Sequence, residues 1–65
     1  MKFKNLASEM VKNGIETSDI ANLLGKTQKS VSQKLNGKID LYMDEIIKIR
    51  NFLNPELSIE YLFIN

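Results

Sequence analysis

Residues 16–38 read ETSDIANLLGKTQKSVSQKLNGK and decide the fold of this chain. The first part of this stretch repeats apolar residues at the spacing of one helix face, which predicts a short helix over residues 17–24. The apolar residues on that face are Ile20, Ala21, Leu23 and Leu24. Either Thr17 or Ser18 is expected to cap the start of this helix with its hydroxyl oxygen. Gly25 follows the helix, and glycine readily takes the positive φ at which many helices end.

A second short helix is predicted over residues 28–35. Its large apolar residues, Val31 and Leu35, stand one turn apart and form a narrow stripe. Thr27 is a natural N-cap before this helix, and an Asn-Gly pair is a natural stop after it. Asn-Gly also favours β-hairpins, but the flanking periodicity is helical and not alternating, which argues against a hairpin. The polar residues opposite the stripe are Gln28, Lys29, Ser32, Gln33 and Asn36.

Three further helices are predicted around this pair. The first covers residues 3–13 and ends before Gly14, which can adopt a left-handed conformation. Its apolar side holds Phe3, Leu6, Ala7, Met10 and Val11, and its polar side holds Lys2, Lys4, Glu9 and Lys12. The fourth helix of the chain covers residues 43–53 and is stopped by Pro55. Ser58 is then expected to cap a short last helix.

Composition indicates a small domain without covalent or metal cross-links. The chain has 65 residues, 43% of them hydrophobic, and contains neither Cys nor His. We therefore expect a single all-α domain over residues 1–65, a compact five-helix unit with no cofactor and no metal. A core of this size gives only marginal stability, so dimerisation is expected to supplement it. The lack of cysteine, of a signal peptide and of a long apolar run favours a cytoplasmic protein with no membrane segment.

The charged residues are unevenly distributed. The net charge is only +1, yet residues 26–38 hold four lysines and none of the eight acidic residues. A basic element of this kind is either an ordinary solvated helix face or the electrostatic footprint of a nucleic-acid binder. The amides and hydroxyls on the polar face of the 28–35 helix favour the second interpretation. We expect that face to contact double-stranded DNA.

The pattern from Thr17 to Leu35 resembles the helix-turn-helix of the lambdoid phage repressor and Cro family, also called the XRE-type family. The residues that carry the resemblance are Ile20, Ala21, Leu24, Gly25, Thr27, Gln28, Ser30 and Val31, with Asn36, Gly37 and Lys38 at the helix end. Residues 44–46 and 58–63 also resemble the last two helices of small phage and Gram-positive bacterial regulators. The resemblance implies a helix-turn-helix at about residues 16–36 in a sequence-specific DNA-binding regulator, acting as a repressor.

Two sets of DNA contacts are expected. Base edges in the major groove would be read by polar side chains, because glutamine can bind adenine through two hydrogen bonds and lysine can donate to guanine. The expected base contacts are Gln28, Lys29, Ser32 and Gln33. The expected DNA backbone contacts are Thr17, Ser18, Lys26, Thr27, Lys34, Asn36 and Lys38. The resemblance supports Thr17 and Asn36 in this second set.

Lys26 and Lys34 depart from the family pattern, which usually has apolar residues at both positions. We expect Leu35 to replace the apolar anchor at position 34. This replacement would rotate the 28–35 helix slightly and leave Lys34 free to reach a phosphate.

The expected partner is a pseudo-palindromic operator bound by a C2 homodimer, with half-sites about one helical turn apart, ~34 Å. The expected dimer interface is the C-terminal segment, with Tyr61, Phe63 and Ile64 and with Leu57 nearby. Leu62 and Phe63 are at the same time expected to close the core of each monomer.

Two other classes of function are alternatives to DNA binding. An enzyme is disfavoured because the chain lacks His and Cys, and because the adjacent Asp44 and Glu45 must point to different sides of a helix. We therefore expect no catalytic residue. A protein-interaction module of the same fold, of antitoxin or antirepressor type, is the alternative. The 28–35 helix argues against it, because that helix lacks the aromatic anchor typical of protein interfaces.

Overall fold

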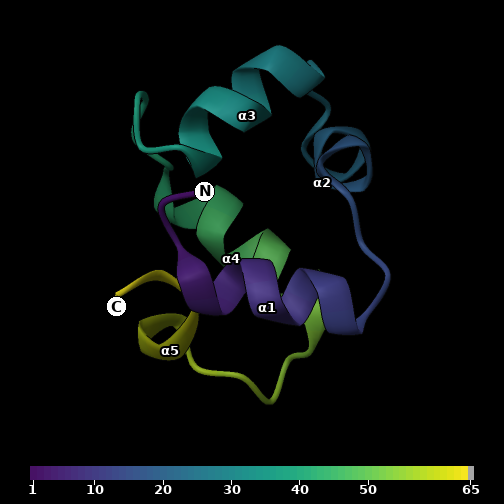
Figure 1. The fold of residues 1–65 in the computed structure, drawn as a ribbon, viewed down its shortest axis with the longest axis vertical. Helices are drawn as coiled ribbons and strands as arrows, with labels where there is room; N and C mark the ends of the chain where they lie inside the picture. Colours follow the sequence, from purple (N-terminus) through teal and green to yellow (C-terminus); the bar gives the residue numbers. More distant parts are fainter. Residues whose placement is uncertain (65) are drawn as a thin grey trace.

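The computed structural model describes residues 1–64 and contains, over that range, five helices and no strand (Figure 1). The helices are α1 (Lys4–Lys12), α2 (Thr17–Leu24), α3 (Gln28–Leu35), α4 (Met43–Leu53) and α5 (Ile59–Phe63). The prediction of an all-α five-helix domain is confirmed. In the described part of the chain, no helix is both long enough and apolar enough to cross a membrane.

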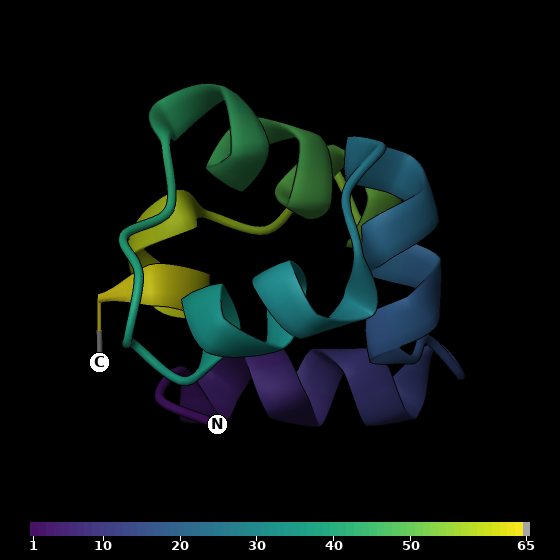
Figure 2. The ribbon, with the colours of Figure 1, turned by 90° about the horizontal axis from the view of Figure 1, so that it is seen from above.

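The helices enclose one small core. The closely packed pairs are α1 with α5, α2 with α3, α2 with α4, and α4 with α5. Figure 1 shows α3 above α1 and α4, and Figure 2, seen from above, shows α2 beside it. The buried apolar residues come from all five helices and are Leu6, Met10, Ile20, Ala21, Val31, Leu35, Ile49, Leu53 and Leu62. The radius of gyration of the Cα atoms is 10.5 Å.

The C-terminal helix closes this core as expected. Leu62 is fully buried. Phe63 is half-buried and meets the ring of Phe3 edge-on, with 5.3 Å between the ring centroids. The first and last parts of the chain are therefore packed against each other.

Most of the residues that were predicted to cap the helix ends are confirmed. The hydroxyl of Thr27 accepts a hydrogen bond from the Ser30 N–H at 3.1 Å and caps α3. Ser58 caps α5 in the same way. The predicted cap of α2 is wrong: neither Thr17 nor Ser18 holds that position, which belongs to Glu16. The Asp19 carboxylate accepts the Glu16 N–H at 2.8 Å, so an acid in the first turn satisfies this helix start.

Two residues of α1 lie on the opposite side from the one predicted. Val11, placed on the apolar side, is 81% exposed. Glu9, placed on the polar side, is buried because α5 packs there and the Tyr61 hydroxyl donates to its carboxylate at 2.8 Å. The hydrogen bond from Tyr61 lowers the pKa of Glu9, and a weaker effect of burial raises it. The Lys12 ammonium, 3.3 Å from the same carboxylate, lowers that pKa further.

Candidate nucleic-acid interface

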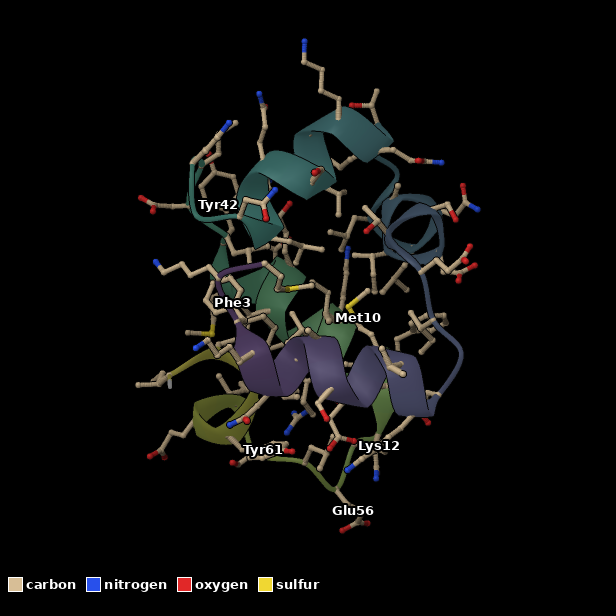
Figure 3. All side chains as sticks on the ribbon, in the orientation of Figure 1. Phe3, Met10, Lys12, Tyr42, Glu56 and Tyr61 are labelled. Carbon is tan, nitrogen blue, oxygen red and sulfur yellow. The ribbon has the colours of Figure 1, made fainter. Side chains whose placement is uncertain are left out.

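α3 presents an uncovered polar face on one side of the molecule. In Figure 1 it forms the upper edge of the fold, and Figure 3 shows side chains extending from it into open space. Gln28, Lys29 and Ser32 are exposed, and Gln33 is half-buried. All four predicted base-contacting residues therefore lie on α3, and three of them are exposed.

The opposite side of α3 is held by a narrow buried seam. Val31 and Leu35 are buried and belong to the core, as their spacing predicts. The turn before α3 is fixed by Gly25, which has φ 66°, and by the Lys26 N–H, which donates to Ala21 O at 3.0 Å. These contacts hold α3 against α2 and leave its polar face free.

The start of α2 meets the start of α3 across a groove of about 450 Å³. Thr17 and Ser18, predicted from sequence as DNA backbone contacts, line this groove together with Gln28. Its other lining residues are Met1, Ala7, Met10, Val11, Ile15 and Glu16. The structure thus places one expected base contact, Gln28, near two expected backbone contacts, Thr17 and Ser18, at this end of α3.

Exposed polar residues flank α3 at both ends. Lys26 and Thr27 precede it and are exposed. Asn36 and Lys38 follow it, and both are exposed as well. The Lys38 N–H donates to Gln33 O at 2.9 Å, so the chain after α3 folds back onto the last turn. Exposed lysines therefore stand at both ends of the polar face.

Lys2 is a neighbour of this surface that sequence reasoning missed. Its backbone N–H donates to Leu35 O at 2.9 Å, at the C-terminal end of α3. Its side chain passes Gly37, where a Cβ would stand only 2.7 Å from the Lys2 Cδ. Gly37 has φ 81°, so glycine suits this position both by conformation and by space. No spacing pattern connects residue 2 with residues 35–37, because their proximity arises only from the tertiary fold.

The prediction for Lys34 is wrong. Lys34 is not free to reach a phosphate, because it is buried and its Nζ lies 2.6 Å from Oε2 of Glu45. The side chains of the two residues are only 5% and 4% exposed. Leu35 is buried in the core, as expected of an apolar anchor, but it anchors α3 beside Lys34 and does not free Lys34 from the interior. The chain turns after Gly37 and brings the first turn of α4 to the last turn of α3. Glu45, in that first turn of α4, supplies a carboxylate for Lys34.

Glu45 is held as an anion by the groups around it. Burial raises the pKa of this carboxyl, but hydrogen bonds from the Lys34 ammonium and the Tyr42 backbone N–H lower it. The positive charges of Lys34 and Lys26 lower it further, so the net pKa is below the ordinary value. Oε1 accepts the Tyr42 N–H at 2.9 Å, and the Tyr42 ring lies over the Lys34 ammonium with its centroid 5.0 Å away.

The chemistry available on this surface is hydrogen bonding and charge. Among residues 1–64, no cluster of three or more His, Cys, Asp or Glu side chains could hold a metal ion. Comparisons with protein-family models, with curated proteins and with solved structures found no match.

Proposed function

We propose that this chain is a sequence-specific double-stranded DNA-binding protein of the helix-turn-helix type, acting as a small transcriptional repressor. The observation that carries the proposal is the uncovered face of α3, which bears amides, a hydroxyl and an ammonium, while the buried residues of the helix, Val31, Lys34 and Leu35, lie on its other side. Helices that read DNA enter the major groove in this manner, with the N-terminal residues of the second helix against base edges. The resemblance to the lambdoid repressor and Cro family supports the same assignment.

In this proposal α3 reads the sequence. Gln28 and Gln33 are suited to adenine, because the amide NH2 can donate to N7 while the amide oxygen accepts from the N6 amino group. Lys29 is suited to guanine, whose O6 and N7 are both acceptors. Ser32 lies between these side chains on the same exposed face and can bond to more than one base.

A second group of residues positions the protein on the phosphates. Phosphate contacts supply most sequence-independent affinity and weaken as salt is added, because bound cations are released from DNA. The residues proposed for this role are Thr17, Ser18, Lys26, Thr27, Asn36 and Lys38. Lys34 does not belong to this group, because its ammonium is buried against Glu45.

Selection of bound sequences from a random DNA library would test DNA binding, site symmetry and base preference together. Affinity titrations of variants on the selected site and on random DNA then distinguish the residues that read bases from the residues that contact phosphates. Gln28→Ala is expected to lose roughly 1–3 kcal/mol on the selected site and to relax one base preference. Lys38→Ala is expected to weaken all sequences alike and to flatten the salt dependence. Equal losses on selected and random DNA for Gln28→Ala would show that Gln28 does not read bases.

The proposal includes a C2 homodimer on a pseudo-palindromic operator, with half-sites ~34 Å apart. Of the C-terminal residues considered for the interface, Ile64 is the most accessible, at 71% exposed. The Tyr61 hydroxyl donates to Glu9, and the Phe63 ring packs against Phe3. Both side chains therefore have less surface left to contact a second subunit. Sedimentation of the protein alone and on DNA tests this step, and a monomer at high concentration in both samples would refute the dimer.

A protein-interaction role is the second candidate, and one observation favours it. Three large apolar residues near the start of α4, Ile39, Tyr42 and Met43, are exposed. Exposed apolar residues in one segment are a common feature of protein interfaces. A mobility-shift assay with random DNA at two salt concentrations separates the candidates. Salt-sensitive binding supports the DNA-binding proposal, and its absence at low salt favours the protein-interaction role.

A further inference from the structure

We propose that Lys34 and Glu45 are positioning residues for base reading. Their buried ion pair sets the orientation of α3 relative to α4, and thereby the place that the exposed face of α3 takes in the major groove. This inference rests on the proposed DNA-binding function and adds to it a role for two residues that do not touch DNA.

The first argument is how α3 is attached to the rest of the fold. α3 packs closely against α2, but α3 and α4 are not among the closely packed helix pairs. α3 and α4 share the apolar core, and the polar link between them is made by two long side chains, with Nζ of Lys34 2.6 Å from Oε2 of Glu45. Lys34 is in the last turn of α3 and Glu45 in the first turn of α4. The pair therefore holds the C-terminal end of α3, which lies away from the turn between α2 and α3, together with the hydrogen bond from the Lys2 N–H to Leu35 O.

The second argument is that the carboxylate is itself held in place. Oε1 of Glu45 accepts the Tyr42 backbone N–H at 2.9 Å, while Oε2 faces the ammonium. The Tyr42 ring covers the ammonium at 5.0 Å, a distance at which a cation is attracted to an aromatic face. Both oxygens of Glu45 and one face of the Lys34 ammonium are thus constrained. An acceptor held at two points defines the position of its donor more narrowly than an acceptor held at one.

The third argument concerns why the link is ionic. A buried ion pair is often no more stabilising than an apolar pair of similar volume, so stability alone does not require it. A hydrogen bond has a preferred length and angle, whereas the hydrophobic contact between methylene groups is non-directional. Bidentate contacts to a base also depend on geometry, and a displacement of about 1 Å takes them outside hydrogen-bonding range. A directional link at α3 therefore serves base reading more than it serves folding.

The test replaces the ion pair by an apolar pair of similar size, Lys34→Met with Glu45→Leu. The matched control is Asp44→Asn with Lys48→Gln, which removes one acid and one lysine from the exposed surface of α4. A conservative variant, Lys34→Arg, keeps a cation opposite Glu45. For each protein, affinities for the selected site and for random DNA are measured at two salt concentrations, and folding is checked by thermal melting.

We expect the apolar double variant to melt at or above the temperature of the wild type. Its ratio of selected-site to random affinity should fall about tenfold, the loss of roughly one base contact, while its random-DNA affinity and salt dependence stay within about twofold of the wild type. Lys34→Arg should keep most of the ratio, and the surface control should keep all of it. An unchanged ratio in the folded double variant would overturn the proposal.

Two further measurements keep the test decisive. If the apolar double variant does not fold, Glu45→Asp retains both charges but withdraws the carboxylate by one methylene. The same fall in the ratio is then expected, and an unchanged ratio overturns the proposal. Residual dipolar couplings report the angle between α3 and α4 without DNA, and an unchanged angle in the variant would also overturn it. A wild type that binds no DNA would instead refute the proposed function, while the couplings still decide whether the pair orients α3.

Discussion

Replacing Glu45 by glutamine removes the anion that faces Lys34 and leaves the size of the side chain almost unchanged. The amide oxygen can still accept the Tyr42 N–H, so the start of α4 keeps its hydrogen bond. The Lys34 ammonium, only 5% exposed as a side chain, then has no counterion. The perturbation therefore isolates the electrostatic part of the contact between α3 and α4.

The expected loss is large relative to the stability of so small a domain. Removing one partner of a buried ion pair costs about 3–5 kcal/mol, because the remaining charge is left uncompensated. Single domains have roughly 0.05–0.15 kcal/mol of stability per residue, which for this chain is about 3–10 kcal/mol in total. In a domain of this size, a loss of that order lowers the melting temperature by roughly 12–40 °C. We expect Glu45→Gln to be marginally folded at room temperature.

The assay is urea unfolding followed by circular dichroism, repeated from neutral to acid pH. The pKa of Glu45 is lower in the folded protein than its ordinary value of 4.5. Its ion pair therefore contributes fully above the unfolded pKa and is lost as the pH falls through the folded pKa. The difference between wild type and variant should be largest near neutral pH. It should close as the pH falls below about 4.5, because protonated Glu45 is also uncharged.

Glu56→Gln is the matched control, because Glu56 is exposed and its side chain forms no ion pair among the described residues. It should change the free energy of unfolding by no more than about 0.5 kcal/mol. A loss below about 1 kcal/mol for Glu45→Gln at neutral pH, or a difference between wild type and variant that does not depend on pH, would refute the reasoning.

Three further predictions concern stability and can be measured by the same urea unfolding. Leu62→Ala should cost about 2–5 kcal/mol, because it opens a cavity at a fully buried position. Val11→Ala, at an 81% exposed position, should stay within about 0.5 kcal/mol, and a similar cost for both would contradict the description of the core. Thr27→Ala should cost about 1 kcal/mol by leaving the Ser30 N–H without its acceptor, and no loss would mean that water replaces the cap freely. Gly25→Ala should cost about 1–2 kcal/mol, because φ is 66° there; a neutral result would mean that the turn can change its conformation.

The helices around the turn could be predicted from sequence because their signals are local. The bounds predicted for α2, α3 and α4 agree with the structure residue for residue. Apolar periodicity identifies each helix, and a cap residue such as Thr27 marks where α3 begins. The accessible face of α3 follows from the same periodicity, because the narrow seam of Val31 and Leu35 leaves the opposite side uncovered.

The two charged residues that were expected to be exposed but are buried, Glu9 and Lys34, depend on contacts made by the tertiary fold. Glu9 is buried by its bond to Tyr61, which is 52 residues away in sequence. Lys34 is buried because Glu45, 11 residues on, returns to it from α4. A charged residue on a helix is normally exposed, and only a partner brought by the tertiary fold overrides that tendency. Sequence spacing contains no information about such a partner.

The two tyrosines make the helix junctions visible to spectroscopy. The chain has no tryptophan, so its ultraviolet emission comes from Tyr42 and Tyr61. The Tyr61 phenol donates to the Glu9 carboxylate at 2.8 Å, and such a bond quenches a tyrosine by drawing off its proton in the excited state. Tyr42 is 66% exposed and lies beside the Lys34 ammonium, so it is expected to be the brighter of the two. Separation of α1 from α5 should therefore restore the Tyr61 emission. A change at the start of α4 should alter the Tyr42 emission. The contact between α1 and α5 and the contact between α3 and α4 thus each have an optical signal that needs no added label.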